Sequence, residues 1–127
     1  MKIYNGTTHQ INFYSESQTT LVGRKLVVKE GEKPLYSLST GEKVLGCVKY
    51  DSTTPEGLKK LPFMVVGAQK FKEVDPLPPG YDLYIVSNIY RSAVQANGGD
   101  TSKLGVVSGV VGDSEGRACG CLKVAVG

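Results

Sequence analysis

The segment VSNIYRSA, residues 86–93, combines the residue types that bind an anion. Ser87 and Asn88 stand where an apolar strand-type run gives way to helical spacing, and the first N–H groups of a helix have no partner within the helix. Such groups bind phosphates, and Arg91, one turn into the helix, has a guanidinium suited to bidentate contact. We therefore predict an anion-binding site at this junction. The alternative is that Ser87 only caps the helix and Arg91 is solvated.

Other side chains supply aromatic rings and further positive charge for such a site. Tyr84 and Tyr90 flank the junction, and either ring offers a face on which a base can stack. Arg24, Lys25 and Arg117 lie in segments expected to be turns, from which they can add charge. We include all five in the predicted ligand-binding set.

The residues that commonly perform catalysis or bind metals are few and scattered. His9 is the only histidine, which excludes any site that needs two imidazoles. With Cys47, Cys119 and Cys121 it would suffice for a Cys3His zinc site, but the spacing is not a recognised one. No signature of a Cys–His nucleophile surrounds any cysteine, and the 12 acidic residues nominate no catalytic pair. We predict a protein without catalytic activity or metal, whose cysteines are free thiols.

Composition and charge exclude several classes of partner. The glycines match neither GxxxxGK[ST] nor GxGxxG, so we expect no cofactor. A net charge of +3 is too small to indicate stable binding of a nucleic-acid polymer. No apolar run is long enough to span a membrane, and the start MKIYNGTTHQ lacks the apolar region of a secretory signal. We therefore expect no membrane partner and a cytoplasmic location.

The elements that must position these residues are mostly short strands. A chain of 127 residues, with 16 glycines and no tryptophan, favours one domain, residues 1–127, built from strands and turns. The one helix is expected at about 88–97, with Ser87 as its N-cap and Gly98-Gly99 as its end. The predicted fold class is α+β, mainly β: a bent antiparallel sheet or small barrel of seven to nine strands with one short helix.

Apolar alternation and turn residues place the individual segments. We expect strands in a hairpin over 3–13, a pair around a turn at 23–25, an edge strand at 35–38, and strands at 43–50, 63–71, 82–88, 104–111 and 118–126. The strand at 63–71 is expected to be buried. Residues 51–61 are expected to form an exposed loop, and the prolines of 72–80 a stiff linker.

Two parts of the sequence carry a resemblance to a group of proteins. The opening MKIYNGTTH, and DLYIVSNIYRSA together with a C-terminal Gly120-Cys121, are similar to small proteins of tailed-phage and prophage genomes that begin with a short strand and Asn-x-Thr-x-His. The likeness covers about a third of the chain. It places Asn5, Thr7 and His9 in a shared motif, and implies no activity for them. We include Asn5 and His9 in the predicted ligand-binding set; the alternative for His9, in a turn, is hydrogen bonding to the backbone. The likeness implies an accessory phage protein in the host cytoplasm.

Two functions follow as hypotheses. The first is a non-catalytic protein that sequesters an anionic, nucleotide-like signal, a cyclic nucleotide or a molecule of the cyclic ADP-ribose class, similar in role to phage sponge proteins that counter host antiviral defence. Such a protein needs pockets at subunit boundaries, so we expect a homo-oligomer. The alternative is a virion structural, decoration or adaptor protein that acts through protein–protein contacts. A nuclease or cyclic-nucleotide hydrolase is disfavoured, because nothing in the sequence explains activation of water.

Overall fold

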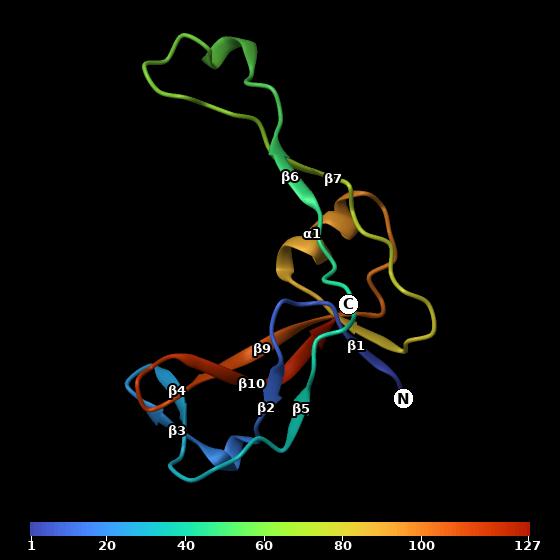
Figure 1. Cartoon of the computed structure of the whole chain (residues 1–127). Helices are drawn as coiled ribbons and strands as arrows, with labels where there is room; N and C mark the ends of the chain where they lie inside the picture. Colours follow the sequence, from blue (N-terminus) through green and yellow to red (C-terminus); the bar gives the residue numbers. More distant parts are fainter.

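A computed structural model describes all residues, 1–127, and is mainly β, as the sequence predicts (Figure 1). It has one α-helix, α1 (Asn88–Ala96), and two short 3-10 helices, η1 (Glu16–Gln18) and η2 (Glu56–Leu58). The ten strands are β1 (Ile3–Asn5), β2 (Ile11–Phe13), β3 (Thr19–Val22), β4 (Lys25–Val28), β5 (Tyr36–Leu38), β6 (Val48–Asp51), β7 (Gln69–Lys72), β8 (Leu83–Ile85), β9 (Leu104–Gly112) and β10 (Ala118–Val126).

The hairpin of β9 and β10 is the longest regular feature of the fold. The two nine-residue strands pair antiparallel over almost their whole length. The turn between them is closed by a hydrogen bond from the Asp113 N–H to the Arg117 carbonyl at 2.8 Å. Gly116 has φ of 81° in this turn, a conformation that glycine adopts without a steric penalty. The hairpin confirms the strands predicted at 104–111 and 118–126.

All other strands of the large sheet join this hairpin. The order is β1-β8-β9-β10-β2-β5, and β4 pairs with the far end of β9 beside its hairpin partner β3. Four pairings are parallel, namely β1 with β8, β8 with β9, β4 with β9 and β10 with β2. The sheet is therefore mixed rather than purely antiparallel. Parallel partners come from distant parts of the chain, which local alternation does not reveal.

The hairpin expected over residues 3–13 does not form. β1 pairs with β8, whereas β2 pairs with β10 and β5. The two strands lie apart in the sheet because each finds longer-range partners. The pair around Gly23 and the edge strand β5 are confirmed.

Asn5 joins the two outer strands of the sheet, β1 and β5, so that the sheet is nearly closed into a barrel. Its side chain donates to the carbonyls of His9 (2.9 Å) and Leu38 (3.1 Å), and its Oδ1 accepts from the N–H and hydroxyl of Thr7. Its own carbonyl accepts from the Gly41 N–H at 2.8 Å. Gly41 is required there, because a Cβ would lie 2.3 Å from the Tyr4 ring.

The core is small and lies on both sides of this junction. One buried cluster joins β1, β8, α1 and β9 through Tyr4, Leu45, Tyr84, Val86, Tyr90 and Leu104. A second, within the curved sheet, is formed by Ile11, Ile85 and Cys121. Only 16 of the 127 residues are buried, so a few side chains hold most of the fold together. The one α-helix, nine residues long, falls short of the length needed to cross a membrane.

A long arm extends from this body. It consists of β6 and β7, paired antiparallel, and the connecting segment 52–68, which Figure 1 shows extended away from the rest of the molecule. The prediction of a strand over 43–50 is correct only for its end. The strand predicted over 63–71 forms only at its end, in β7, and it is not buried. Phe63 and Met64 are exposed instead, because no part of the body lies over them. The loop predicted at 51–61 and the linker at 72–80 are confirmed apart from short regular pieces.

Replacing Asn5 by Ala should lower the free energy of unfolding by about 2–3 kcal/mol, because the buried amide is lost and the partly buried Leu38 carbonyl and Thr7 N–H lose their partner. Asn5→Asp should be at least as destabilising, since a carboxylate cannot donate to the two carbonyls. Urea unfolding followed by far-UV circular dichroism measures both. Asn97→Ala, at an exposed position, is the control and should change the value by less than about 0.5 kcal/mol. A stability for Asn5→Ala equal to that of the control would contradict this account of closure.

Candidate functional site

The first turn of α1 is built as the sequence predicts. Ser87 is the N-cap, and its Oγ accepts a hydrogen bond from the Tyr90 N–H at 3.2 Å. At the other end the helix stops at Asn97, and Gly98 follows with φ of 75°. Strand β8 thus delivers Ser87 and Asn88 to a helix N-terminus, where unpaired N–H groups and the helix dipole favour an anion.

A hollow of about 240 Å³ lies beside this turn, and we call it the Arg91 hollow. Its polar side chains are Asn88, Arg91 and Ser108, and the rest of its lining is Val106, Val107, Ala125 and Val126. Nε of Arg91 is buried and has no hydrogen-bond partner in the protein. A buried unpaired donor is costly, and an anion in the hollow would offset that cost once the guanidinium turns so that Nε faces it.

A second hollow of about 360 Å³, the Arg24 hollow, lies at the opposite end of β9. It is lined by Arg24 and Lys25 of the β3–β4 hairpin, by Gly116 and by strand residues of β4, β9 and β10. Arg117 follows Gly116 in the β9–β10 turn and forms an exposed ion pair with Glu115 at 3.5 Å. Arg24 and Lys25 therefore line one hollow and Arg91 another, and Arg117 lines neither of them.

His9 lines a third hollow of about 330 Å³, the His9 hollow, which lies between the other two. It shares Val107 with the Arg91 hollow, and Val110 and Ala118 with the Arg24 hollow. Cations thus flank a largely apolar surface. Its remaining lining comes mainly from β2 and from residues 118–121.

Three predicted ligand residues have structural roles instead. Tyr84 and Tyr90 are 5% and 1% exposed, so neither ring is accessible for stacking. The Tyr84 hydroxyl donates to the Pro78 carbonyl, and the Tyr90 hydroxyl donates to the Asp75 carbonyl. Asn5 is 2% exposed, and its side-chain hydrogen bonds all join parts of the backbone or Thr7. In a chain without tryptophan the tyrosines are needed to fill the core.

The three cysteines are free thiols, as expected. Cys119 and Cys121 line the His9 hollow, whereas Cys47 lies beside Ser87 in a different one. No group of three or more histidine, cysteine or acidic side chains is close enough to hold a metal ion, so the Cys3His alternative has no geometric support. Burial raises the pKa of the Cys121 thiol, which makes its nucleophilic thiolate less available.

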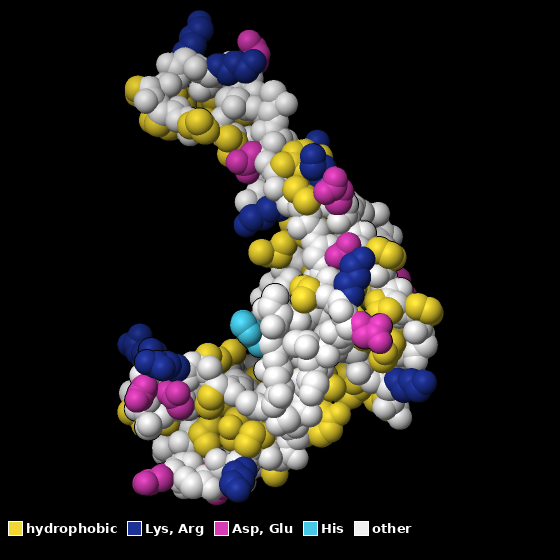
Figure 2. All heavy atoms as spheres, viewed as in Figure 1, with side chains coloured by type: hydrophobic (Ala, Val, Ile, Leu, Met, Phe, Trp, Pro, Cys, Tyr) yellow, Lys and Arg dark blue, Asp and Glu magenta, His cyan; other side chains and the backbone are white.

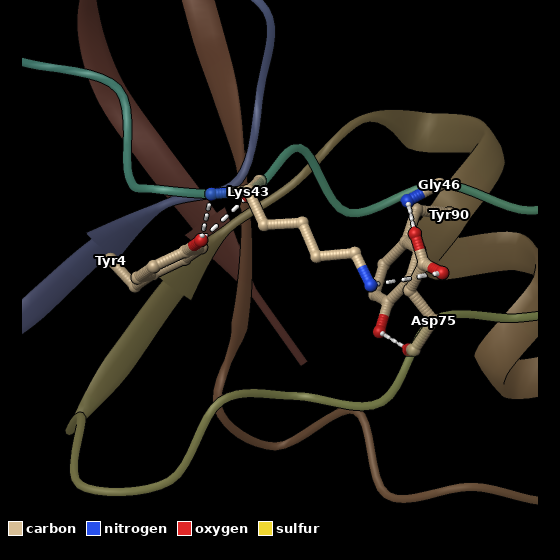
Figure 3. Close-up of polar contacts among 5 residues, drawn as sticks. All are labelled: Tyr4, Lys43, Gly46, Asp75 and Tyr90. Atoms are coloured by element: carbon tan, nitrogen blue, oxygen red, sulfur yellow. Dashed lines mark hydrogen bonds and ion pairs between the residues drawn. The ribbon is translucent and has the colours of Figure 1, made fainter.

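The sequence did not indicate the polar contacts around Asp75 (Figure 3). Its Oδ2 accepts from the Gly46 N–H at 2.8 Å, its carbonyl accepts from the Tyr90 hydroxyl at 2.5 Å, and Lys43 Nζ lies 4.0 Å from its Oδ1. Tyr4 holds the same segment, because its hydroxyl donates to the Lys43 carbonyl at 2.6 Å. These contacts bind both ends of the arm to β1 and α1. The only sequence signal is an aspartate before a run of prolines.

Comparison with known proteins adds nothing to this geometry: no family model, no curated protein and no solved structure matches the chain. The structure alone therefore defines the class of protein: a mainly β body with shallow cationic hollows and a projecting arm.

Tyr90 should make the fold sensitive to alkali. Burial, with the nearby Asp75 carboxylate and Cys47 thiol, raises its pKa above the ordinary value of 10.0. Its contribution to stability is complete below that pH and is lost as the pH rises through the folded pKa. Tyr90→Phe should lower the free energy of unfolding at neutral pH by about 1 kcal/mol, through loss of the hydroxyl bond, and should lose less stability above about pH 10 than wild type does.

Urea unfolding at about pH 7 and about pH 10.5 measures the two effects. Tyr36→Phe, which alters a tyrosine that is 53% exposed, is the matched control. A Tyr90→Phe profile parallel to that of wild type would contradict the assignment.

Proposed function

We propose that this protein binds a small anionic, nucleotide-like molecule without transforming it, at the Arg91 hollow. The observation that carries the proposal is the buried, unpaired Nε of Arg91 beside the first turn of a helix. A phosphate there would accept from the Arg91 guanidinium, with Asn88 and Ser108 as further donors, whereas Ser87 lines a different hollow beside Cys47. The proposed role, by likeness to phage sponge proteins, is to sequester a host antiviral signal of the cyclic nucleotide or cyclic ADP-ribose class in the host cytoplasm.

The corrections to the predicted set change how such a ligand would lie. With Tyr84 and Tyr90 in the core, the base would rest on apolar side chains such as Val126, which is 59% exposed. A hollow of about 240 Å³ is smaller than most ligand pockets, which begin at about 300 Å³. The ligand would therefore extend into the neighbouring His9 hollow or be covered by a second subunit. The Arg24 hollow is available to a second phosphate.

Binding without turnover fits the distribution of reactive groups. The single histidine has no acidic side chain hydrogen-bonded to it, and no acid, thiol or histidine lines the Arg91 hollow. General acid–base catalysis requires such groups within hydrogen-bond reach of the substrate. The proposal therefore assigns no catalytic residue.

A virion structural, decoration or adaptor protein is the second candidate, and the exposed apolar arm favours it. Phe63 is 64% and Met64 89% exposed, which suits a surface that contacts another protein. Mass spectrometry of purified phage particles tests this candidate, and absence of the chain from the particles would exclude it.

The ligand proposal predicts that a panel of cyclic dinucleotides and cyclic ADP-ribose molecules contains at least one that raises the melting temperature of the protein. Arg91→Ala should weaken its affinity by about 10- to 100-fold, the loss expected for a charge-assisted hydrogen bond. Lys49→Ala removes the same charge from the arm and should leave the affinity unchanged. Isothermal titration calorimetry measures both variants, and Arg24→Ala reports whether the Arg24 hollow takes part.

Mass spectrometry of the ligand released after denaturation should find it intact. Loss of ligand over long incubation would indicate an enzyme and contradict the proposal. A panel in which no nucleotide shifts the melting temperature would do the same.

A further inference from the structure

The arm has no core of its own. None of the residues 48–72 is buried, and its apolar side chains Leu58, Leu61, Phe63, Met64 and Val66 are 41–89% exposed. The few polar contacts in its tip include Thr54 Oγ1 to the Val65 carbonyl at 2.5 Å. An isolated two-stranded hairpin is marginally stable in water. Within one chain, therefore, nothing buries the apolar side chains of the arm.

The exposed area of the whole chain leads to the same conclusion. A compact protein of 13.6 kDa is expected to expose about 6,600 Å². This chain exposes 8700 Å². The excess, about 2,000 Å², is more than twice the ~800 Å² that each partner buries in a standard protein–protein interface. The chain thus exposes enough additional surface to form an interface with another protein chain.

Hydrogen bonds hold the base of the arm to the body. The N–H of Asp75, after β7, donates to the carbonyl of Gly46, before β6, at 3.0 Å. The Gly46 N–H in turn donates to Oδ2 of Asp75 at 2.8 Å. The Tyr90 hydroxyl ties the same point to α1. Figure 2 shows the result, a crescent whose upper end carries a patch of hydrophobic side chains. The arm is held away from the body rather than folded over it.

The charges of the chain indicate what covers the arm. Five lysines and two acids lie within residues 48–72: Lys49, Lys59, Lys60, Lys70, Lys72, Asp51 and Glu56. At the opposite end of the molecule is a hollow of about 570 Å³ that we call the acidic hollow. It is lined by Glu30, Glu32 and Asp113 with a single lysine, Lys29, and by the apolar groups of Tyr14 and Val28. The two ends are complementary in charge, and both contain apolar groups.

We infer that the arm of one subunit packs on the acidic hollow of a second copy of this chain. Phe63 and Met64 would supply the apolar contact. Lys60 would face Glu30 and Glu32, and Lys59, which pairs with Glu56 within the arm at 2.9 Å, would join it by exchanging partners. The two regions lie at opposite ends of one chain in Figure 1, so the contact is made between chains. Reciprocal exchange about a twofold axis gives a closed dimer, whereas one-way packing gives a ring or filament. The inference concerns the arm alone and does not depend on the ligand at Arg91.

Sedimentation velocity of the full chain tests the inference. Wild type should sediment as a dimer or a larger oligomer. Phe63→Ser/Met64→Ser should raise the dissociation constant by roughly 100-fold, because two large apolar side chains are lost from each contact. Leu21→Ser/Val22→Ser is the matched control: these residues are 65% and 59% exposed on β3, away from the arm and outside the acidic hollow. Far-UV circular dichroism verifies that each variant is folded.

Charge reversal identifies the surface that receives the arm. Lys59→Glu/Lys60→Glu should weaken assembly, and Glu30→Lys/Glu32→Lys in the same chain should restore it. Restoration supports the acidic hollow, and failure to restore it overturns that part of the inference. A wild-type chain that stays monomeric at its highest soluble concentration overturns the whole, and would assign the arm to a different protein. A monomeric Phe63→Ser/Met64→Ser variant that still binds ligand would separate assembly from the proposed function.

Discussion

The fold depends on one buried amide, that of Asn5, because it provides the hydrogen bonds that the sheet itself cannot. The two outer strands, β1 and β5, are three residues long and do not pair with each other. Without the Asn5 side chain, the Leu38 carbonyl would lose this donor and the His9 carbonyl would keep only the Thr7 hydroxyl, at 3.1 Å. An amide suits this position because it donates and accepts at once, whereas a carboxylate only accepts. These hydrogen bonds hold the junction together although the core on either side of it is small.

The second consequence of so small a core is that polar contacts position the outlying parts. Asp75 and Tyr90 bind the ends of the arm to the helix, and the same tyrosine fills the centre of the buried cluster. The proposed Arg91 ligand contact and the contact that holds the arm therefore both come from the first turn of α1. Ligand binding and assembly are proposed for separate surfaces, but both surfaces are positioned by α1.

Part of the candidate site follows from local sequence. Ser87 as an N-cap, a helix that ends before Gly98, and the β9–β10 turn depend on neighbouring residues, and all are predicted correctly. The roles of Tyr84 and Tyr90 are not, because nothing local distinguishes a tyrosine that presents its ring to a ligand from one that fills a core. Phe63 and Met64 show the reverse error, since an apolar run predicts burial even when no partner in the chain covers it.

The sequence by itself determined the mainly β class, the single capped helix and the absence of paired histidines, because these properties depend on residue type and short-range spacing. Only the tertiary structure decided which strands are parallel neighbours, that Arg91 and Arg24 serve different hollows, and that residues 48–72 project as an arm. Each of these depends on contacts between residues far apart in the chain. Such contacts are selected by the balance of burial and hydrogen bonding over the whole molecule, which no short segment contains.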